Sequence, residues 1–156
     1  MLNWLKSLFA PPAPAGPQVT LTAIKPDEPI LAQDGVRAEG DGWRIDIAAP
    51  HSVRLFEVPV SGIEQCLLAY RAQVKCENLK GRAFLELWCR IPGSGEFFSK
   101  GLQQPVSGTS DWVSCETPFH LKRGQRPDLL KLNLAVEGTG TVWLRNLQIL
   151  KTPLAR

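Results

Sequence analysis

One strand-like segment, Arg82 to Ile91, alternates aromatic and ionisable side chains in a way that suits sugar binding. Because successive side chains of a strand point to opposite faces, one face of this segment carries Phe84, Glu86, Trp88 and Arg90. An aromatic ring stacks on the apolar face of a sugar ring, while carboxylate and guanidinium groups hydrogen-bond its hydroxyls. These four residues are therefore the predicted ligand-binding site.

Two pairs of residues are candidate ligand or partner contacts. Arg71 and Gln73 lie on the outward face of the preceding run, Cys66 to Cys76, and contribute only if their strand lies beside the aromatic one. The adjacent aromatics Phe97 and Phe98 point to opposite faces of any strand they form, so one of them is exposed unless it is covered.

The strands that neighbour this face are not determined by the pattern, and two alternatives stay open. Lys131 and Asn133 would join the site if their strand lies beside it. In a purely structural interpretation, the long Gly- and Ser-rich loop from Pro92 to about Ser110, or the N-terminal strand, folds over the face. That loop would bury the aromatic residues and leave Glu86 and Arg90 as an ion pair at the rim.

Catalytic arrangements are scarce, so we predict no catalytic residue and no enzyme activity. The chain contains neither a G-x-S-x-G nucleophile turn nor a Gly-rich phosphate-binding loop. His51 and His120 flank strand ends without a neighbouring nucleophile to activate. Glu86 and Glu116 are the available carboxylates for glycoside hydrolysis, and nothing in their spacing favours such a pair.

The cysteine and charge content argue against several other classes. Four cysteines occur without any C-x-x-C spacing and with only two histidines, so neither a metal site nor a cofactor is expected. Cys66 and Cys76 fall in one run about 33 Å apart, too far for a disulfide. Buried, reduced thiols fit a cytoplasmic protein. The net charge of +3 comes without a basic stripe, which argues against a nucleic-acid partner.

The first nine residues form an amphipathic pattern on a helical wheel. Trp4, Leu5, Leu8 and Phe9 share one arc and are the predicted membrane contacts, in a helix that lies in the bilayer interface. A stiff Pro- and Ala-rich spacer follows up to Pro17, so residues 1–17 form one segment and residues 18–156 the domain. The alternatives are a signal peptide, which would make the protein exported, and a terminus that is frayed or docked on a protein partner.

A basic turn contains Lys122, Arg123 and Arg126. It could contact phosphate or anionic headgroups. The pattern favours a solvated turn, because no aromatic residue accompanies it.

From Val19 onward the apolar residues recur with period two, which predicts strands and no further helix. The expected strands are 19–24, 43–47, 52–60, 66–76, 82–91, 96–98, 112–121, 128–137 and 141–150, with a turn at 78–81. Strands with one apolar face each predict a two-sheet antiparallel β-sandwich. Trp43, Trp112 and Trp143, at strand starts among apolar neighbours, are expected to be packing residues.

The later strands resemble a known fold family. Asp111-Trp112, the run 116–119, and the pair of strands around Gly138-Thr139-Gly140 resemble the ending of galactose-binding-like jelly rolls, found among carbohydrate-binding modules. The run 70–75 is similar to their central strand, and the resemblance covers about residues 42–150. The segment 87–102 resembles a stretch of bacterial jelly-roll proteins of this length, a likeness that carries no activity with it. The resemblance implies a jelly roll that binds a ligand.

One departure from that family concerns calcium. Many such modules end the last strand with two aspartates that help to hold a structural calcium ion, and this chain has Arg145 and Asn146 there. A guanidinium repels a cation, so no calcium is expected at this position.

Together these observations predict a non-catalytic binding module, with a carbohydrate or similar polar ligand on the aromatic face. The alternative is a membrane-peripheral or scaffolding module that binds a protein partner and is held at the membrane by residues 1–9. The fold resemblance favours carbohydrate binding. The amphipathic segment and the reduced thiols favour the membrane-peripheral or scaffolding role.

Overall fold

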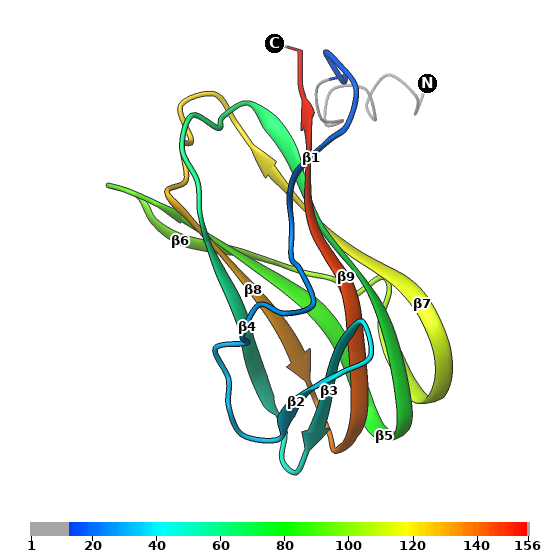
Figure 1. Cartoon of the computed structure of the whole chain (residues 1–156). Helices are drawn as coiled ribbons and strands as arrows, with labels where there is room; N and C mark the ends of the chain where they lie inside the picture. The colour runs from blue at the N-terminus through cyan, green and yellow to red at the C-terminus, as the bar shows by residue number, and fades with distance from the viewer. Residues whose placement is uncertain (1–12, 156) are drawn as a thin grey trace.

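The computed structural model describes residues 13–155, and in this range the chain forms nine strands and no helix (Figure 1). The strands are β1 (Val19–Ala23), β2 (Val36–Glu39), β3 (Gly42–Ile47), β4 (His51–Pro59), β5 (Cys66–Ile91), β6 (Gly95–Lys100), β7 (Val106–Leu121), β8 (Leu129–Val136) and β9 (Gly140–Pro153). The predicted all-β antiparallel fold is confirmed. The helix predicted for residues 1–9 lies outside the described residues.

The long strand β5 joins two sheets because it bends in its middle. Its first half pairs with β7 and β9, and its second half pairs with β6 and β8. The bend contains Asn78 and Gly81, whose φ angles of 50° and 72° lie in the left-handed region. The reversal predicted at residues 78–81 is therefore confirmed, although it lies inside one continuous strand. The two halves of β5 are antiparallel to β9 and to β8, which run in opposite directions, so the chain turns at the bend from one sheet into the other (Figure 1).

The first sheet has the order β2-β3-β9-β5-β7, with β1 beside the end of β9, and the second has the order β4-β8-β5-β6. Their inner faces pack together, and the alternation predicted from the sequence holds on both. Leu85 and Leu87 from the second sheet and Leu68 and Leu144 from the first are almost completely buried. This apolar interior holds the outward side chains in place.

All four cysteines are buried in this interior as free thiols, so the predicted burial is confirmed. Burial raises the pKa of the Cys89 thiol to about 12 and that of Cys115 to about 11, because the thiolate loses its hydration. These thiols act as small apolar core residues.

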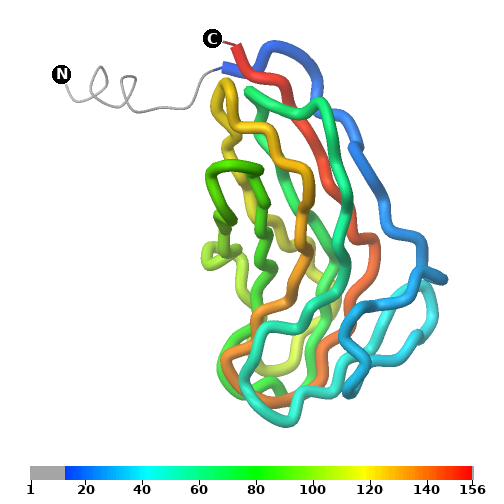
Figure 2. Tube along the Cα trace, turned by 90° about the vertical axis from the view of Figure 1, so that its left-hand side faces the viewer, coloured from blue at the N-terminus to red at the C-terminus, as the bar shows by residue number. Residues whose placement is uncertain are grey.

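Both ends of the described chain lie at one end of the sandwich (Figure 2). The Ala15 amide donates to the Pro153 carbonyl at 2.7 Å, and the Ala155 amide donates to the Ala13 carbonyl at 2.8 Å. The stretch expected to be a spacer thus pairs with the C-terminal strand from residue 13 onward. No helix within residues 13–155 is long and apolar enough to cross a membrane.

Candidate functional site

The outer face of the second sheet holds a shallow hollow of about 580 Å³. Cross-strand register builds it, because Glu86 lies opposite Asn133 on β8 and Lys100 on β6, and Trp88 lies opposite Lys131 and Phe98. We call this surface the Trp88 face; its lining residues are Ser52, Arg54, Glu86, Trp88, Glu96, Phe98, Lys100, Lys131 and Asn133.

An aromatic pair forms the apolar part of the Trp88 face. The ring centroids of Trp88 and Phe98 are 4.9 Å apart, with the planes tilted by 45°. Trp88 is half-buried and supports Phe98, a residue that is 53% exposed and whose ring centroid lies 5.2 Å from Lys100 Nζ. A supported and exposed ring is the kind of surface on which the apolar face of a sugar stacks.

A buried carboxylate forms the polar part. Glu86 is only 5% exposed, and its Oε1 atom accepts hydrogen bonds from Trp88 Nε1 (2.8 Å) and Asn133 Nδ2 (3.2 Å). Ser52 Oγ donates to the same oxygen at 3.4 Å. These bonds fix the carboxylate, the indole and the amide in one arrangement, so their geometry is preorganised.

The second carboxylate oxygen of Glu86 accepts no hydrogen bond from residues 13–155. Within that range only Tyr70 Oη is both fully buried and unpartnered, so this second oxygen remains in reach of solvent. It is an acceptor for a ligand hydroxyl beside the aromatic pair.

One ion pair lines the hollow, and a second lies outside it at Arg90, two residues beyond Trp88 on β5. Lys131 Nζ lies 2.7 Å from Glu96 Oε1, and Arg90 Nε donates to Asp128 at 2.8 Å. The hydrogen bond from Arg90 lowers the pKa of Asp128 below its ordinary value. The rim ion pair considered between Glu86 and Arg90 is wrong, because Arg90 pairs with Asp128.

The predicted site residues are thus partly brought together. Glu86 and Trp88 line the hollow, and Phe98 joins them from β6. Phe84 is 4% exposed, with the Arg82 guanidinium 5.6 Å from its ring centroid, and Arg90 lies outside the hollow.

The segment after Pro92 does not cover the aromatic face. Residues 95–100 form β6, which pairs beside β5 and widens the sheet. Phe97 and Phe98 are both exposed, at 42% and 53%. The covering-loop interpretation is therefore wrong, and β1 pairs with β9 on the other sheet.

Arg71 and Gln73 lie on the outer face of the first sheet, away from the Trp88 face. Arg71 Nη2 lies 2.8 Å from Glu116 Oε1. Gln73 Oε1 accepts hydrogen bonds from Arg145 Nε at 2.7 Å and from Asn146 Nδ2 at 2.9 Å. Arg145 and Asn146 occupy the positions of the two aspartates of the resembled family, and both donate hydrogen bonds to Gln73. No group of three or more possible metal ligands occurs among residues 13–155.

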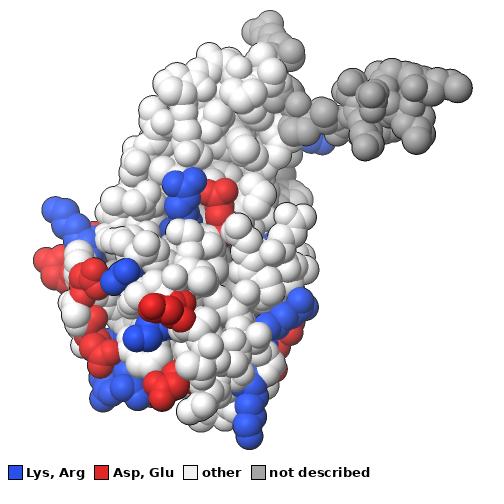
Figure 3. All heavy atoms as spheres, turned by 90° about the vertical axis from the view of Figure 1, so that its right-hand side faces the viewer, with Lys and Arg blue, Asp and Glu red and all other residues white. Residues whose placement is uncertain are grey.

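Two tryptophans stand on this same surface, which we call the Trp143 face. Trp143 lies between Lys75 Nζ at 5.1 Å and the Arg44 guanidinium at 5.4 Å, and its Nε1 donates to Glu39. Trp112 lies 4.0 Å from the Arg145 guanidinium. Figure 3, which views the β7 side, shows charges of both signs intermingled over its lower part.

The expectation that all three tryptophans pack inside is therefore wrong for two of them. Trp43 is buried and meets Phe56 edge to face at 5.3 Å. Trp112 and Trp143 are half-buried on the outer face. For Trp143 the alternation along β9 already indicated an outward position, because Trp143 lies on the same face of the strand as Thr141 and Arg145.

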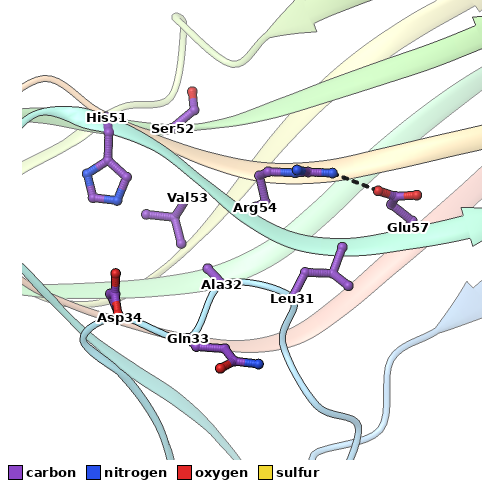
Figure 4. A pocket seen from close by; sticks show the side chains of 9 residues that line it. All are labelled: Leu31, Ala32, Gln33, Asp34, His51, Ser52, Val53, Arg54 and Glu57. Atoms are coloured by element: carbon purple, nitrogen blue, oxygen red, sulfur yellow. Dashed lines mark hydrogen bonds and ion pairs between the residues drawn. The ribbon is translucent and has the colours of Figure 1, made fainter.

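A second hollow, of about 440 Å³, lies between β4 and the segment 31–34 (Figure 4). The segment 31–34 borders it, held by amide bonds from Leu31 and Ala32 to the carbonyls of Leu55 and Arg54. Ser52 and Arg54 line both hollows, and Arg54 is directed to Glu57 at 2.9 Å. Sequence analysis missed this hollow because segment 31–34 has no strand periodicity.

Comparison with known proteins identifies the fold. No protein-family profile matches the chain, and no curated protein matches its sequence. Among solved structures, it is similar to the CBM22-1 xylan-binding domain of Xyn10C from Paenibacillus barcinonensis, with 16% identity and a TM-score of 0.57, covering 90% of this chain and 99% of that one.

Two further solved structures show how widely the fold occurs. A CBM4 structure matches with 11% identity and a TM-score of 0.55, covering 80% of this chain and 95% of that one. A chain of infectious bursal disease virus, Gx strain, matches with 10% identity and a TM-score of 0.55, covering 89% of this chain and 33% of that one. The chain thus has a jelly-roll fold like that of carbohydrate-binding modules, as the resemblance implied, and a fold by itself carries no function.

Proposed function

We propose that the chain is a non-catalytic module that binds a carbohydrate, or a similar polar ligand, on the Trp88 face. The observation that carries the proposal is the exposed Phe98 ring, supported by Trp88, beside the fixed Glu86–Asn133 pair in one hollow. A sugar needs this combination, because its ring has an apolar face and its rim consists of hydroxyls.

The energetics favour weak but specific binding. Stacking on an aromatic ring contributes about 1 kcal/mol beyond the burial of its area. Each hydrogen bond adds about 1 kcal/mol net, and bonds to a charged carboxylate add somewhat more. A shallow hollow with one ring and a few polar groups therefore fits a dissociation constant on the order of micromolar to millimolar.

The second carboxylate of the hollow is held in an ion pair. Glycoside hydrolysis uses two carboxyl groups about 5 to 9.5 Å apart. Glu96 lines the same hollow as Glu86 and is paired with Lys131 at 2.7 Å. Glu116, the other candidate considered, lies on the other sheet and pairs with Arg71. These placements support a binding role.

The fold comparison supports the ligand class in general terms, since one similar structure is described as a xylan-binding domain. A structural similarity at 16% sequence identity supports a test with polysaccharides, and it does not favour any particular polysaccharide. A panel of soluble xylan, mannan, glucan and galactan oligosaccharides is therefore the appropriate probe.

The test is calorimetric titration of the full chain with that panel, using Phe98→Ala as the diagnostic variant. Phe98 is exposed, so its removal should leave the fold intact and weaken binding about tenfold, the loss of about 1.4 kcal/mol. Trp143→Ala is the matched control and should bind like the wild type. Failure of the wild-type chain to bind any sugar, or equal binding by both variants, would overturn the proposal.

A further inference from the structure

We infer that the end of the sandwich that carries both chain termini docks on an anionic membrane surface. This terminal end consists of residues 13–15, residues 153–155 and the turn from β7 to β8. The proposal is independent of sugar binding, because the Trp88 face lies on the side of the sandwich. A module attached by its end leaves that side open to the surrounding water.

An apolar hollow of about 380 Å³ opens at the terminal end. Its floor is formed by the buried side chains of Leu121 and Leu154, the half-buried Ala155 lies beside them, and the exposed Lys122 and Arg123 also line it. Apolar surface next to exposed cations matches the membrane interface, where acyl chains lie beneath charged headgroups.

The charge of the terminal end is positive because its nearby carboxylate is already neutralised. Glu64 accepts bonds from the Gly124 amide at 2.6 Å and from Arg126 at 3.0 Å, and these bonds lower its pKa. Lys122 and Arg123 form no ion pair with any residue in the range 13–155. Two basic side chains are thus directed to solvent beside the apolar hollow, which complements anionic headgroups.

The amphipathic N-terminal sequence begins at the same place. Ala13 is tied to Ala155, which lines the hollow together with Lys122 and Arg123. The predicted membrane contacts, Trp4, Leu5, Leu8 and Phe9, precede Ala13 by four to nine residues and lie outside the described residues.

The chain segment that leads to the amphipathic N-terminal sequence therefore starts at the same end of the fold as the basic turn. The membrane binding of an amphipathic segment strengthens with the apolar area that it buries and with electrostatic attraction to anionic lipids. Each basic residue near an anionic surface contributes about 1 kcal/mol. In the sequence no aromatic residue lies near the basic turn. In the fold, the turn lies beside Ala13, which follows the aromatic N-terminal sequence.

The test is co-sedimentation of the full chain with vesicles made of equal parts phosphatidylcholine and phosphatidylglycerol, compared with pure phosphatidylcholine vesicles. We expect binding to the anionic vesicles and at least tenfold weaker binding by the double variant Lys122→Glu/Arg123→Glu. The matched control is Arg37→Glu/Lys80→Glu, which changes net charge equally at exposed positions away from the terminal end. It should stay within about threefold of the wild type, the residual effect of net charge.

A second variant tests the apolar half of the proposal. Trp4→Ala/Phe9→Ala should also weaken binding to the anionic vesicles, and thermal melting of all variants checks that the domain stays folded. The inference is overturned if the wild type does not bind the anionic vesicles, or if the two charge-reversal variants bind equally. Sugar titration of the same variants should be unchanged, which separates this proposal from the proposed function.

Discussion

The two outer faces of this sandwich both carry tryptophan among charged and amide side chains, yet they differ in openness. On the Trp143 face, Lys75 and Arg44 flank the indole and Glu39 accepts its Nε1 hydrogen. On the Trp88 face, the aromatic pair reaches solvent through Phe98.

Cross-strand register explains this difference. The direct neighbours of Trp143 are Arg44 on β3 and Lys75 on β5, and long cationic side chains cover an aromatic ring well. The direct neighbours of Trp88 are Phe98 and Lys131, and Lys131 is drawn to Glu96. Phe98 also has a cation beside it, Lys100 Nζ at 5.2 Å from its ring centroid, but it has one such neighbour where Trp143 has two, and 53% of the residue stays exposed.

Glu86→Ala should have the largest effect on stability. It leaves Trp88 Nε1 and Asn133 Nδ2 without their acceptor in a largely buried place, so we expect a loss of about 2 to 4 kcal/mol. Glu116→Ala removes an exposed ion pair on the Trp143 face and should cost less than about 1 kcal/mol. Urea unfolding measures both, and equal losses would contradict the contrast between the faces.

An exchange of amide for carboxylate should act with opposite sign on the two faces. Asn133→Asp places a second carboxylate against Glu86 and should destabilise the fold by about 1 to 3 kcal/mol. Gln73→Glu places a carboxylate where Arg145 and Asn146 donate, and should be neutral or stabilising by up to about 1 kcal/mol. The same unfolding experiment serves here, and a stabilising Asn133→Asp would refute the arrangement described for Glu86.

The two faces should differ least in how much fold stability they lose in acid. The hydrogen bond from Arg90 lowers the pKa of Asp128, at the border of the Trp88 face. On the Trp143 face burial raises the pKa of Asp46, but bonds from Thr141 and Arg44 outweigh this effect and lower it overall. A carboxyl whose pKa is lowered by folding stabilises the fold above its unfolded pKa, and this stabilisation is lost as pH falls through the folded pKa, below about pH 4.

Asp128→Asn and Asp46→Asn should therefore differ from the wild type at pH 7 and converge with it near pH 2. The difference at pH 7 should be larger for Asp128→Asn, because its main interaction with Arg90 is not opposed by a larger burial effect. Unfolding curves at the two pH values measure this. A difference that persists undiminished in acid would show that the carboxylate charge is not its cause.

Local alternation made much of the fold predictable. The side chains expected inside on residues 83–89 and 130–136, such as Leu85 and Leu132, are buried, because the period of a strand depends only on its own backbone. The same alternation identified Glu86 and Trp88 as outward residues of one strand. Alternation also places Trp143 on the outer face, whereas its apolar sequence neighbours wrongly suggested a residue packed inside.

What the sequence by itself determined is therefore which side of its own strand each residue occupies, and hence the β-sandwich class. Only the tertiary structure decided which strands meet: that Asn133 and Phe98 face Glu86 and Trp88, that the bend in β5 sends Arg71 to the other sheet, and that the chain termini meet the basic turn. The physical reason is range. Periodicity is a property of neighbouring residues, whereas strand pairing depends on contacts between segments that are distant in the chain and on the packing of the whole core.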